Sequence, residues 1–572
     1  MTNIAESSAQ SASIFKLPPE ILFEILSLLD VSDLLRIRET CMRIEQLSKD
    51  RSVWLRMLLT QRSRVPIPPP YNGDITNATR ALSCSALSRL VLSIYYIEGS
   101  WLLPRPLPIP LGPPEQSAAP DVSEQGGNTA IFMDVVADHW LVAVYNEGSI
   151  HIWDLYVDGI TPVCTYRRAG LTPEPKCRFN LKLPVVDSVS SASVGLSQDT
   201  STLHILVVSQ TDCTVLDVQL PTVLTTCTTG AYELRLNADH AWKLPRPNFM
   251  ARALHAASKL AFFSYSDTLV LLQWEIGKIW QLRTVDEPTE EEFWTLIIAA
   301  RFISPYHIIC VKTRTVELLT LPSTFLSYPN LSSTSDILRN DENIGHLPTK
   351  ILYHFLSGLN FRGVSMSEAE VSSDGVRISF LAYDILQGLF HYRVSLLLSP
   401  STVPTEVGHD GPPSYMAVRL LAVHRLAQLH STAAEGAANM PRSRSGFTPG
   451  SRAFVSACIL GRTGRRGVWI ERRRGSMRRS VIAFSTAADA PDEEGSSSRR
   501  PGTASGGDDV DQRSGRQEEQ DWMSYGEVRP IDGRVIFEVN SYDLHEDITH
   551  CALAESTGTV ILGNRRGDLK LL

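Results

Sequence analysis

The chain has 572 residues, of which 54 are Lys or Arg and 62 are Asp or Glu, so its formal net charge is −8. Hydrophobic residues make up 43% of it, which is enough for a large core, and the length predicts more than one folding unit. The mild acidity excludes a generally nucleic-acid-binding surface, and no apolar run reaches the roughly 18 residues that a membrane span needs.

The nine Cys form no CxxC pair, which argues against a zinc ribbon and a disulfide framework. The first residues have neither a basic region nor an apolar region of the secretory kind. We therefore expect an intracellular protein, cytoplasmic or nuclear.

Residues 1–13 are polar, and we predict a disordered tail there.

Residues 14–60 are dense in Leu and Ile at helical spacing. Pro18 suits the first turn of a helix, where its missing N–H costs nothing. Asp30 breaks this helix, and Ser32 is the predicted N-cap of a second one. The pattern predicts a compact all-α unit.

This unit carries more Leu and Ile than so small a core can bury, and the excess indicates a docking face for another helix. The run LPPEILFEILSLL, followed by Leu34-Leu35 and Trp54, resembles the F-box, although Ile44 stands where many members have an aromatic residue. The resemblance implies docking to the Skp adaptor of a cullin-based ubiquitin ligase. The alternative is a structural hairpin that packs on its own C-terminal domain. The predicted adaptor-binding residues are Leu17, Pro18, Ile21, Leu22, Ile25, Leu26, Leu34 and Leu35.

Residues 61–98 predict a helical linker, with Leu82, Leu87, Leu90, Val91 and Ile94 on one stripe. The Pro-rich stretch 104–120 separates folded units. We assign 99–572 to a mainly β domain. Within it, 432–450 and 485–520 are rich in Gly, Ser and charged residues and are predicted to be disordered insertions.

From about residue 129 the hydrophobic period changes from 3.6 to 2. Seven units share one order: an apolar strand, a gap, a second strand, a tight turn and a third strand. Such recurrence is typical of a β-propeller, here of about seven blades, or of a sandwich array. The units lie at 131–155, 203–218, 259–276, 297–321, 369–398, 453–484 and 549–572.

Trp153-Asp154, which follows a turn at Gly148, resembles the WD-repeat signature. With the N-terminal unit, the layout resembles F-box proteins with divergent WD-repeat-like propellers, a kind frequent in fungi. Ring closure removes exposed sheet edges, so an N-terminal segment must supply the last strand if the final blade ends on its third. Residues 99–103 are the candidate; the alternative is that they continue the linker.

The sequence contains no complete catalytic motif of the kinds considered below. The spacing between His545 and His550 is one residue longer than in HExxH, and the glycines at 461–467 lack a following GK[ST] and predict a β-turn. Neither a GxSxG elbow nor a kinase motif set is found. We predict a non-enzymatic protein without cofactor or metal.

Residues 441–480 hold eleven Arg and one acid, densest at 472–479. Three interpretations compete: a solvated face, compensated by the acidic stretch 489–521; a nuclear-import signal; and a patch for acidic motifs on a substrate.

The resemblance implies the substrate-recognition subunit of a Skp–cullin–F-box ubiquitin ligase, in which the propeller binds the protein substrate and this chain performs no chemistry. One alternative is an adaptor-independent interaction scaffold. Another, a propeller hydrolase or lyase, requires polar groups that converge at the ring's centre. The substrate's identity depends on loops that fold class does not specify.

Overall fold

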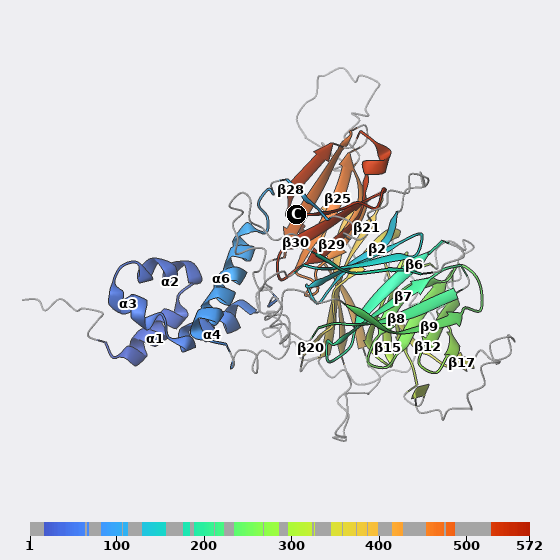
Figure 1. Cartoon of the computed structure of the whole chain (residues 1–572), viewed down its shortest axis with the longest axis horizontal. Helices are drawn as coiled ribbons and strands as arrows, with labels where there is room; N and C mark the ends of the chain where they lie inside the picture. Colours follow the sequence, from blue (N-terminus) through green and yellow to red (C-terminus); the bar gives the residue numbers. More distant parts are fainter. Residues whose placement is uncertain are drawn as a thin grey trace, which may run out of the picture.

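In the computed structural model, a small helical unit lies beside a β-propeller (Figure 1). The predicted tail at 1–13, the predicted insertion at 432–450 and residues 487–520 of the second insertion lie outside the described residues. The described residues are 17–62, 66–67, 80, 82–105, 107–111, 129–155, 176–183, 188–210, 212–221, 234–266, 268–284, 296–322, 325–326, 345–356, 358–372, 375–385, 387–397, 415–426, 453–473, 476–486, 528–540 and 542–572.

The helical unit begins as the sequence predicts, with Pro18 at the N-cap of the first helix. The second helix starts at Val31 after the extended Asp30. Ser32 therefore lies in its first turn, and the predicted N-cap at Ser32 is wrong, because Asp30 already occupies that position. The described helices of this unit are α1 (Pro19–Leu28), α2 (Val31–Arg38), α3 (Met42–Leu47), α4 (Arg51–Arg62) and α6 (Cys84–Ser100).

Helix α6 is the longest described helix, with 17 residues, or about 25 Å. Ser83 caps it: its Oγ accepts a hydrogen bond from the Ala86 N–H at 3.3 Å. Four residues of the predicted apolar stripe, Leu87, Leu90, Val91 and Ile94, are buried on α6, and the fifth, Leu82, precedes the helix and is half-buried. None of the described helices is both long and apolar enough to span a membrane.

The β domain is a closed seven-bladed propeller. Each predicted strand unit falls within one antiparallel sheet, as local connections favour. The innermost strand of each blade contacts the innermost strand of the next, and that of the last contacts that of the first. The innermost strands are β2 (Ala130–Val136), β6 (Ser191–Leu196), β10 (Met250–His255), β14 (Ile297–Ser304), β19 (Phe361–Met366), β24 (Ala453–Leu460) and β29 (Ile548–Ala554).

We number the blades 1 to 7 in this order. The remaining strands of blades 1 to 3 are β3 (Trp140–Tyr145), β4 (Ser149–Asp154) and β5 (Lys176–Lys182); β7 (Thr202–Val208), β8 (Asp212–Gln219) and β9 (Arg235–Lys243); and β11 (Leu260–Tyr265), β12 (Thr268–Gln273) and β13 (Lys278–Leu282).

Blades 4 to 7 follow the same order. Their remaining strands are β15 (His307–Lys312), β16 (Thr315–Thr320) and β18 (Lys350–Phe355); β21 (Gly375–Asp384), β22 (Gly388–Leu397) and β23 (Tyr415–Arg425); β25 (Arg466–Arg473), β26 (Arg478–Ser485) and β28 (Gly533–Asn540); and β30 (Thr559–Asn564), β31 (Leu569–Leu571) and β1 (Ile109–Leu111).

Three short strands add to these sheets. Strand β17 (Gly345–Leu347) pairs in parallel with β13 at the outer edge of blade 3, and β27 (Arg529–Pro530) pairs in parallel with β23 at the outer edge of blade 5. Strand β20 (Glu370–Ser372) pairs with β21. Strands β17 and β27, which lie between the third and fourth strands of blades 4 and 6, thus extend the edges of the preceding blades.

The ring closes through β1, which pairs antiparallel with β31 and sets Ile109 opposite Leu571. An N-terminal segment does supply the last strand, but the predicted segment, 99–103, is wrong. Its first two residues complete α6, and the strand comes from the Pro-rich stretch. Pro110 is tolerated because the outermost strand of a sheet does not need every N–H.

The core lies between adjacent blades. Strand β3 is buried along its whole length, because a neighbouring blade covers each face of its sheet. This sandwiching explains why the central strands read as continuous apolar runs rather than as strict alternation. Outer strands such as β9 alternate between exposed and half-buried residues.

Candidate functional site

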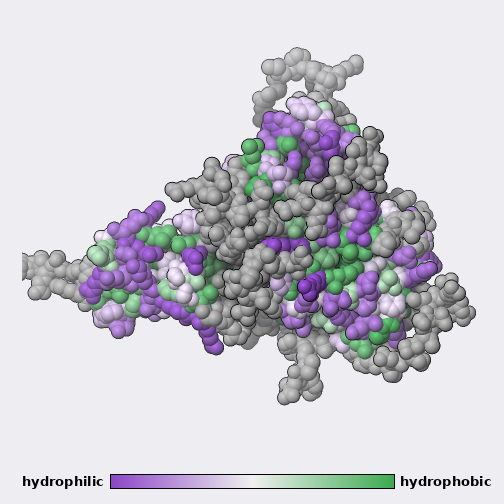
Figure 2. Space-filling model, in the orientation of Figure 1, coloured by the Kyte–Doolittle hydropathy of each residue, from purple (hydrophilic) through white to green (hydrophobic). Residues whose placement is uncertain are grey.

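Helix α1 leaves one apolar face uncovered. Ile21 and Leu28 are 48% and 74% exposed, and Leu17 and Pro18 are exposed as well. With the half-buried Ile25, these residues follow the spacing that places side chains on one side of a helix. We call these five residues the α1 stripe. In Figure 2, hydrophobic residues reach the surface of the helical unit among hydrophilic ones.

The opposite face of α1 builds the unit's own core. Leu26 packs with Leu34, Trp54 and Val91 from the other helices, and Trp54 donates a hydrogen bond from Nε1 to the Ser48 carbonyl oxygen at 2.8 Å. Every described residue of this core belongs to the helical unit rather than to the propeller. The stripe is therefore not hidden against the chain's own strands.

The eight predicted adaptor-binding residues divide by burial. Leu22, Leu26 and Leu34 are buried, Ile25 and Leu35 are half-buried, and the others are exposed. A partner can reach the exposed and half-buried members without unfolding the unit. Leu28 is a further accessible residue that the predicted set lacked; its position three residues after Ile25 was the signal that indicates it.

Helix α6 belongs to both parts of the molecule. Its first turns contribute Leu87 and Leu90 to the helical core. At its other end, Trp101 is buried among residues of blades 6 and 7, including Ile470 and Val560. One helix therefore contributes to the core of the helical unit and leads directly into the core of the propeller.

Four contacts secure this end of α6. The Trp101 Nε1 donates to the Phe484 carbonyl oxygen at 2.9 Å. The guanidinium groups of Arg105 and Arg466 lie over the Trp101 ring, 5.5 and 5.6 Å from its centroid. Arg105 also donates from its backbone N–H to the Ile536 carbonyl oxygen at 2.7 Å.

Helix α6 meets the propeller on the face where the innermost strands end. Ile97 and Trp101 lie beside Gly558, in the turn between β29 and β30, and Arg466 begins β25 on the same side. The opposite face carries the turns between the second and third strands of each blade, such as Asn146–Gly148. This second face points away from the helical unit.

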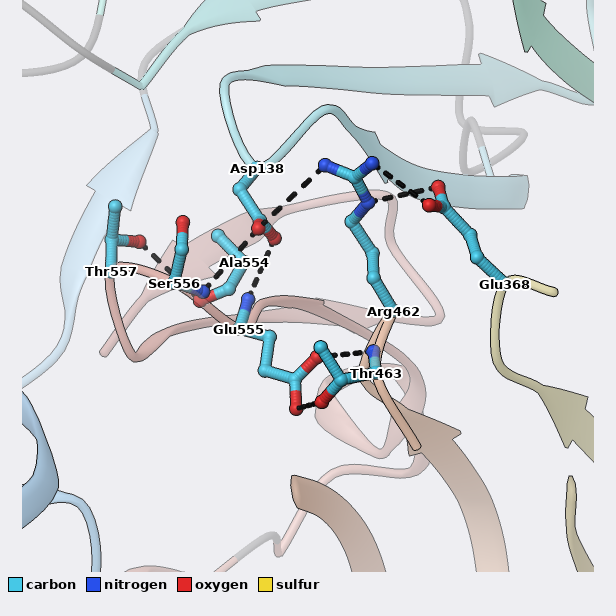
Figure 3. Close-up of polar contacts among 8 residues, drawn as sticks. All are labelled: Asp138, Glu368, Arg462, Thr463, Ala554, Glu555, Ser556 and Thr557. Carbon is cyan, nitrogen blue, oxygen red and sulfur yellow. Dashed lines mark hydrogen bonds and ion pairs between the residues drawn. The ribbon is translucent and has the colours of Figure 1, made fainter. Parts of the chain in front are cut away.

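Beside the α6 contact, a polar cluster joins turns of four blades (Figure 3). Arg462 forms a bidentate ion pair with Glu368, with both N···O distances 2.8 Å. Asp138 accepts from the Glu555 N–H at 2.8 Å, and Glu555 in turn accepts from Thr463 N–H and Oγ1 at 2.7 and 2.6 Å. The cluster crosses the seam where blade 7 meets blade 1.

The charges of this cluster are coupled. Burial raises the pKa of Asp138 and of Glu555 above the ordinary carboxyl values. Burial alone would lower the pKa of Arg462, but Glu368 and Asp138 outweigh it and raise that pKa. Burial also raises the pKa of Asp134, on β2, to about 6. Each carboxylate of the cluster contacts a residue of another blade: Glu368 binds Arg462, Glu555 binds Thr463, and Asp138 binds the Glu555 N–H. The last of these contacts links blade 7 to blade 1 at the seam of the ring.

Among the described residues, no group of His, Cys, Asp and Glu side chains is arranged to hold a metal ion. The glycine-spaced segment 461–467 does contain the turn between β24 and β25, with Gly464 at φ +72°, as predicted.

Three Arg side chains of the densest part of the Arg-rich region lie beside acids. Arg479 is buried and its Nε lies 2.5 Å from the Asp547 Oδ1. Arg472 approaches the same carboxylate at 3.9 Å, and Arg478 lies 3.3 Å from Glu538. Acidic residues of blades 6 and 7 thus offset these three Arg side chains, and Arg479 is buried rather than solvated. The acidic stretch 489–521 lies outside the described residues.

Comparison with known families identifies the helical unit. Residues 14–60 match the F-box-like family model. This chain carries an F-box-like domain followed by a seven-bladed β-propeller. No curated protein matches the chain. An F-box-like domain joined to a propeller is a layout of substrate-recognition and protein-interaction proteins.

Solved structures with similarity include hydrazine synthase of Kuenenia stuttgartiensis (10% identity, TM-score 0.36, 81% of this chain and 99% of that chain). They also include the Nup170 N-terminal domain of Chaetomium thermophilum in complex with Nup53 (9%, 0.40, 77% and 58%) and the C-terminal WD40 domain of Sif2 (8%, 0.34, 78% and 97%). At these TM-scores the assignment of a propeller rests on the strand pairing of this chain.

Proposed function

We propose that this protein is the substrate-recognition subunit of a Skp–cullin–F-box ubiquitin ligase. The helical unit docks a Skp-family adaptor, and through it a cullin, while the propeller binds the protein to be modified. The observation that carries the proposal is the uncovered α1 stripe within a domain that matches the F-box-like model. Exposed apolar side chains in a row are what a partner helix requires.

The role of the chain is then to hold two proteins near each other. Tethering raises the local concentration of the substrate near the charged enzyme of the assembly and converts an encounter into an intramolecular step. Such a role needs a fixed geometry. Helix α6 supports it, because both of its ends are buried in folded structure.

The same geometry favours one face of the propeller for the substrate. The face with the α6 contact is partly covered by the linker, around Trp101 and Gly558. Among the described residues, the contacts of α6 with the propeller lie on that first face and not on the opposite one, which carries the turns between second and third strands. A substrate bound there would stand clear of the adaptor.

The test is adaptor binding by the full chain with Ile21→Asp and Leu28→Asp together, measured by calorimetry against the purified Skp adaptor. Two charges in an apolar contact should cost about 2–4 kcal/mol, or roughly 30- to 1,000-fold in affinity. Tyr96→Asp is the matched control: Tyr96 is also exposed, at 45%, but lies on α6. It should bind like wild type.

If the wild type and the Ile21→Asp/Leu28→Asp variant bind the adaptor equally well, the proposal is contradicted. An adaptor-independent scaffold would then be favoured. Substitutions at Leu22 and Leu26 are poor tests because both are buried in the helical core. Removal of residues 1–60 is also a poor test, since it would uncover Leu87 and Val91 of α6.

A further inference from the structure

The outer edges of the propeller blades are protected in different ways, as unpaired edge strands invite aggregation. Blades 3 and 5 are extended by β17 and β27. The edge of blade 6 receives a hydrogen bond from the Arg105 N–H, and β1 of blade 7 is short and holds Pro110. The edges of blades 1 and 2 are rich in charge, with the sequences KCRFNLK and RLNADHAWK.

Blade 4 lacks these protections. Its edge strand β18 has the sequence KILYHF, in which Lys350 is the single fully charged residue and comes first. Tyr353 and Phe355 are 61% and 52% exposed. Among the described residues, no strand pairs with the outer side of β18, which ends its sheet. An edge with exposed aromatic residues is a template for another strand.

The exposed aromatic residues continue an interior cluster outward. Because side chains alternate along a strand, Ile351, Tyr353 and Phe355 share one face of β18. Ile351 packs against the hydrophobic cluster between blades 3 and 4. The row therefore leads from a buried cluster to the surface, where an added strand would find both backbone groups and apolar neighbours.

The two flanking blades show what occupies such an edge. On blade 3, β17 runs parallel to β13 with Leu282 opposite Leu347. The Leu347 side chain is buried in the cluster between blades 3 and 4. On blade 5, β27 runs parallel to β23 with Val423 opposite Pro530. In each case a short extended segment from a distant part of the chain is enough.

We propose that β18 is a docking edge for a short extended segment of a partner protein, which adds to blade 4 as a fifth, parallel strand. The segment carries an apolar or β-branched side chain at every second position. Those side chains lie beside Tyr353 and Phe355, as cross-strand neighbours do, and backbone hydrogen bonds to β18 supply affinity. This edge is distinct from the α1 stripe and does not depend on the adaptor.

The experiment uses the full chain and a phage-displayed library of random short linear peptides as the probe. We expect enriched peptides with alternating apolar residues. The strongest binder is then measured by fluorescence anisotropy. Binding should weaken at least about ten-fold in Tyr353→Lys and in Phe355→Lys. Tyr415→Lys should bind like wild type; Tyr415 is 55% exposed on blade 5 and is the matched control.

N-methylation of the peptide, one amide at a time, tests the strand geometry. Because alternate amides of an added strand face β18, methylation should weaken binding at every second position only. The proposal is overturned if no peptide is enriched, if Tyr353→Lys retains full binding, or if methylation has no alternating effect. Concentration-dependent dimers that Tyr353→Lys abolishes would also overturn it, since the occupant would then be a second copy.

Discussion

In the central strands of the propeller, such as β3, apolar side chains are covered by a neighbouring blade on each face of the sheet, whereas in the helical unit one face of α1 has no cover. Leu34 of the unit is fully buried, yet Leu28 is 74% exposed. The exposed Leu28 lies in the more apolar helix, α1 (PEILFEILSL), and the buried Leu34 lies in the more polar α2 (VSDLLRIR). The comparison shows that a high content of apolar residues does not by itself distinguish a core from a docking face. The distinction requires knowing how many other elements pack against the helix or strand.

The two regions also differ in how they are closed. The propeller is completed by a strand from outside the repeats, β1, so each blade supports its neighbours around a ring. The helical unit is completed by α6, which leaves it and enters the propeller. The following predictions break or sharpen this contrast, beginning with the largest effect.

Opening the ring should have the largest effect. Leu569 is buried in the cluster shared by blades 7 and 1, and Leu569→Asp places a charge there without a partner. We expect a loss of more than about 4 kcal/mol, enough to unfold the propeller. Chemical denaturation measures it. The adjacent Lys570→Ala, on the other face of β31, should change stability by less than about 1 kcal/mol; equal losses would contradict closure through this strand.

Trp101→Ala should separate the two regions. Loss of a buried Trp side chain costs about 3–5 kcal/mol, and the propeller would lose its anchor to α6. We expect limited proteolysis to cut the chain just after α6 and denaturation to show two transitions. Leu103→Ala, at an exposed position, is the control. An unchanged single transition in Trp101→Ala would show that the anchor is not needed.

Within the helical unit, the two classes of Leu should respond differently. Leu34→Ala should lower the free energy of unfolding by about 2–5 kcal/mol, because it leaves a cavity in the core. Leu28→Ala should change it by no more than about 0.5 kcal/mol, because Leu28 has few neighbours to lose. Thermal unfolding of both variants tests whether the buried Leu34 of α2 and the exposed Leu28 of α1 differ in their contribution to stability. A large loss for Leu28→Ala would contradict it.

The smallest effect concerns charge in the ring. Burial raises the pKa of Asp134 from 3.8 to about 6, so the folded state holds this proton more tightly than the unfolded chain. Its stabilising contribution is present below pH 3.8 and is lost as pH rises to about 6. Asp134→Asn should therefore stabilise the protein at pH 7, by on the order of 1–3 kcal/mol, with no gain at low pH.

Asp199→Asn provides a control of opposite sign. Hydrogen bonds from Ser197 and Ser201 lower the pKa of Asp199 to about 2, so its contribution is present above its ordinary value of 3.8 and is lost as pH falls toward 2. Its substitution should destabilise the protein at pH 7 and have no effect at the lowest pH. If Asp134→Asn changes the free energy of unfolding by the same amount at every pH, the ionisation of Asp134 does not contribute to stability.

Local patterns were sufficient to predict a large part of this architecture. The F-box-like segment, the stripe of α6 and all seven strand units follow from the spacing of apolar residues, because that spacing reports which side of an element meets a core. The position of the closing strand was not predicted. Residues 109–111 are short and contain Pro, so nothing local distinguishes them from the linker around them.

Contacts between residues that are distant in the sequence depend on the tertiary structure and could not be predicted from local patterns. Spacing along α1 marks a wide apolar arc, but only the packing of α4 and α3 against it separates the buried Leu26 from the exposed Ile21. Asp138 accepts from Glu555, 417 positions away, and Arg479 finds Asp547. Periodicity reports the local environment of each residue, whereas partners of this kind exist only after the chain has closed on itself.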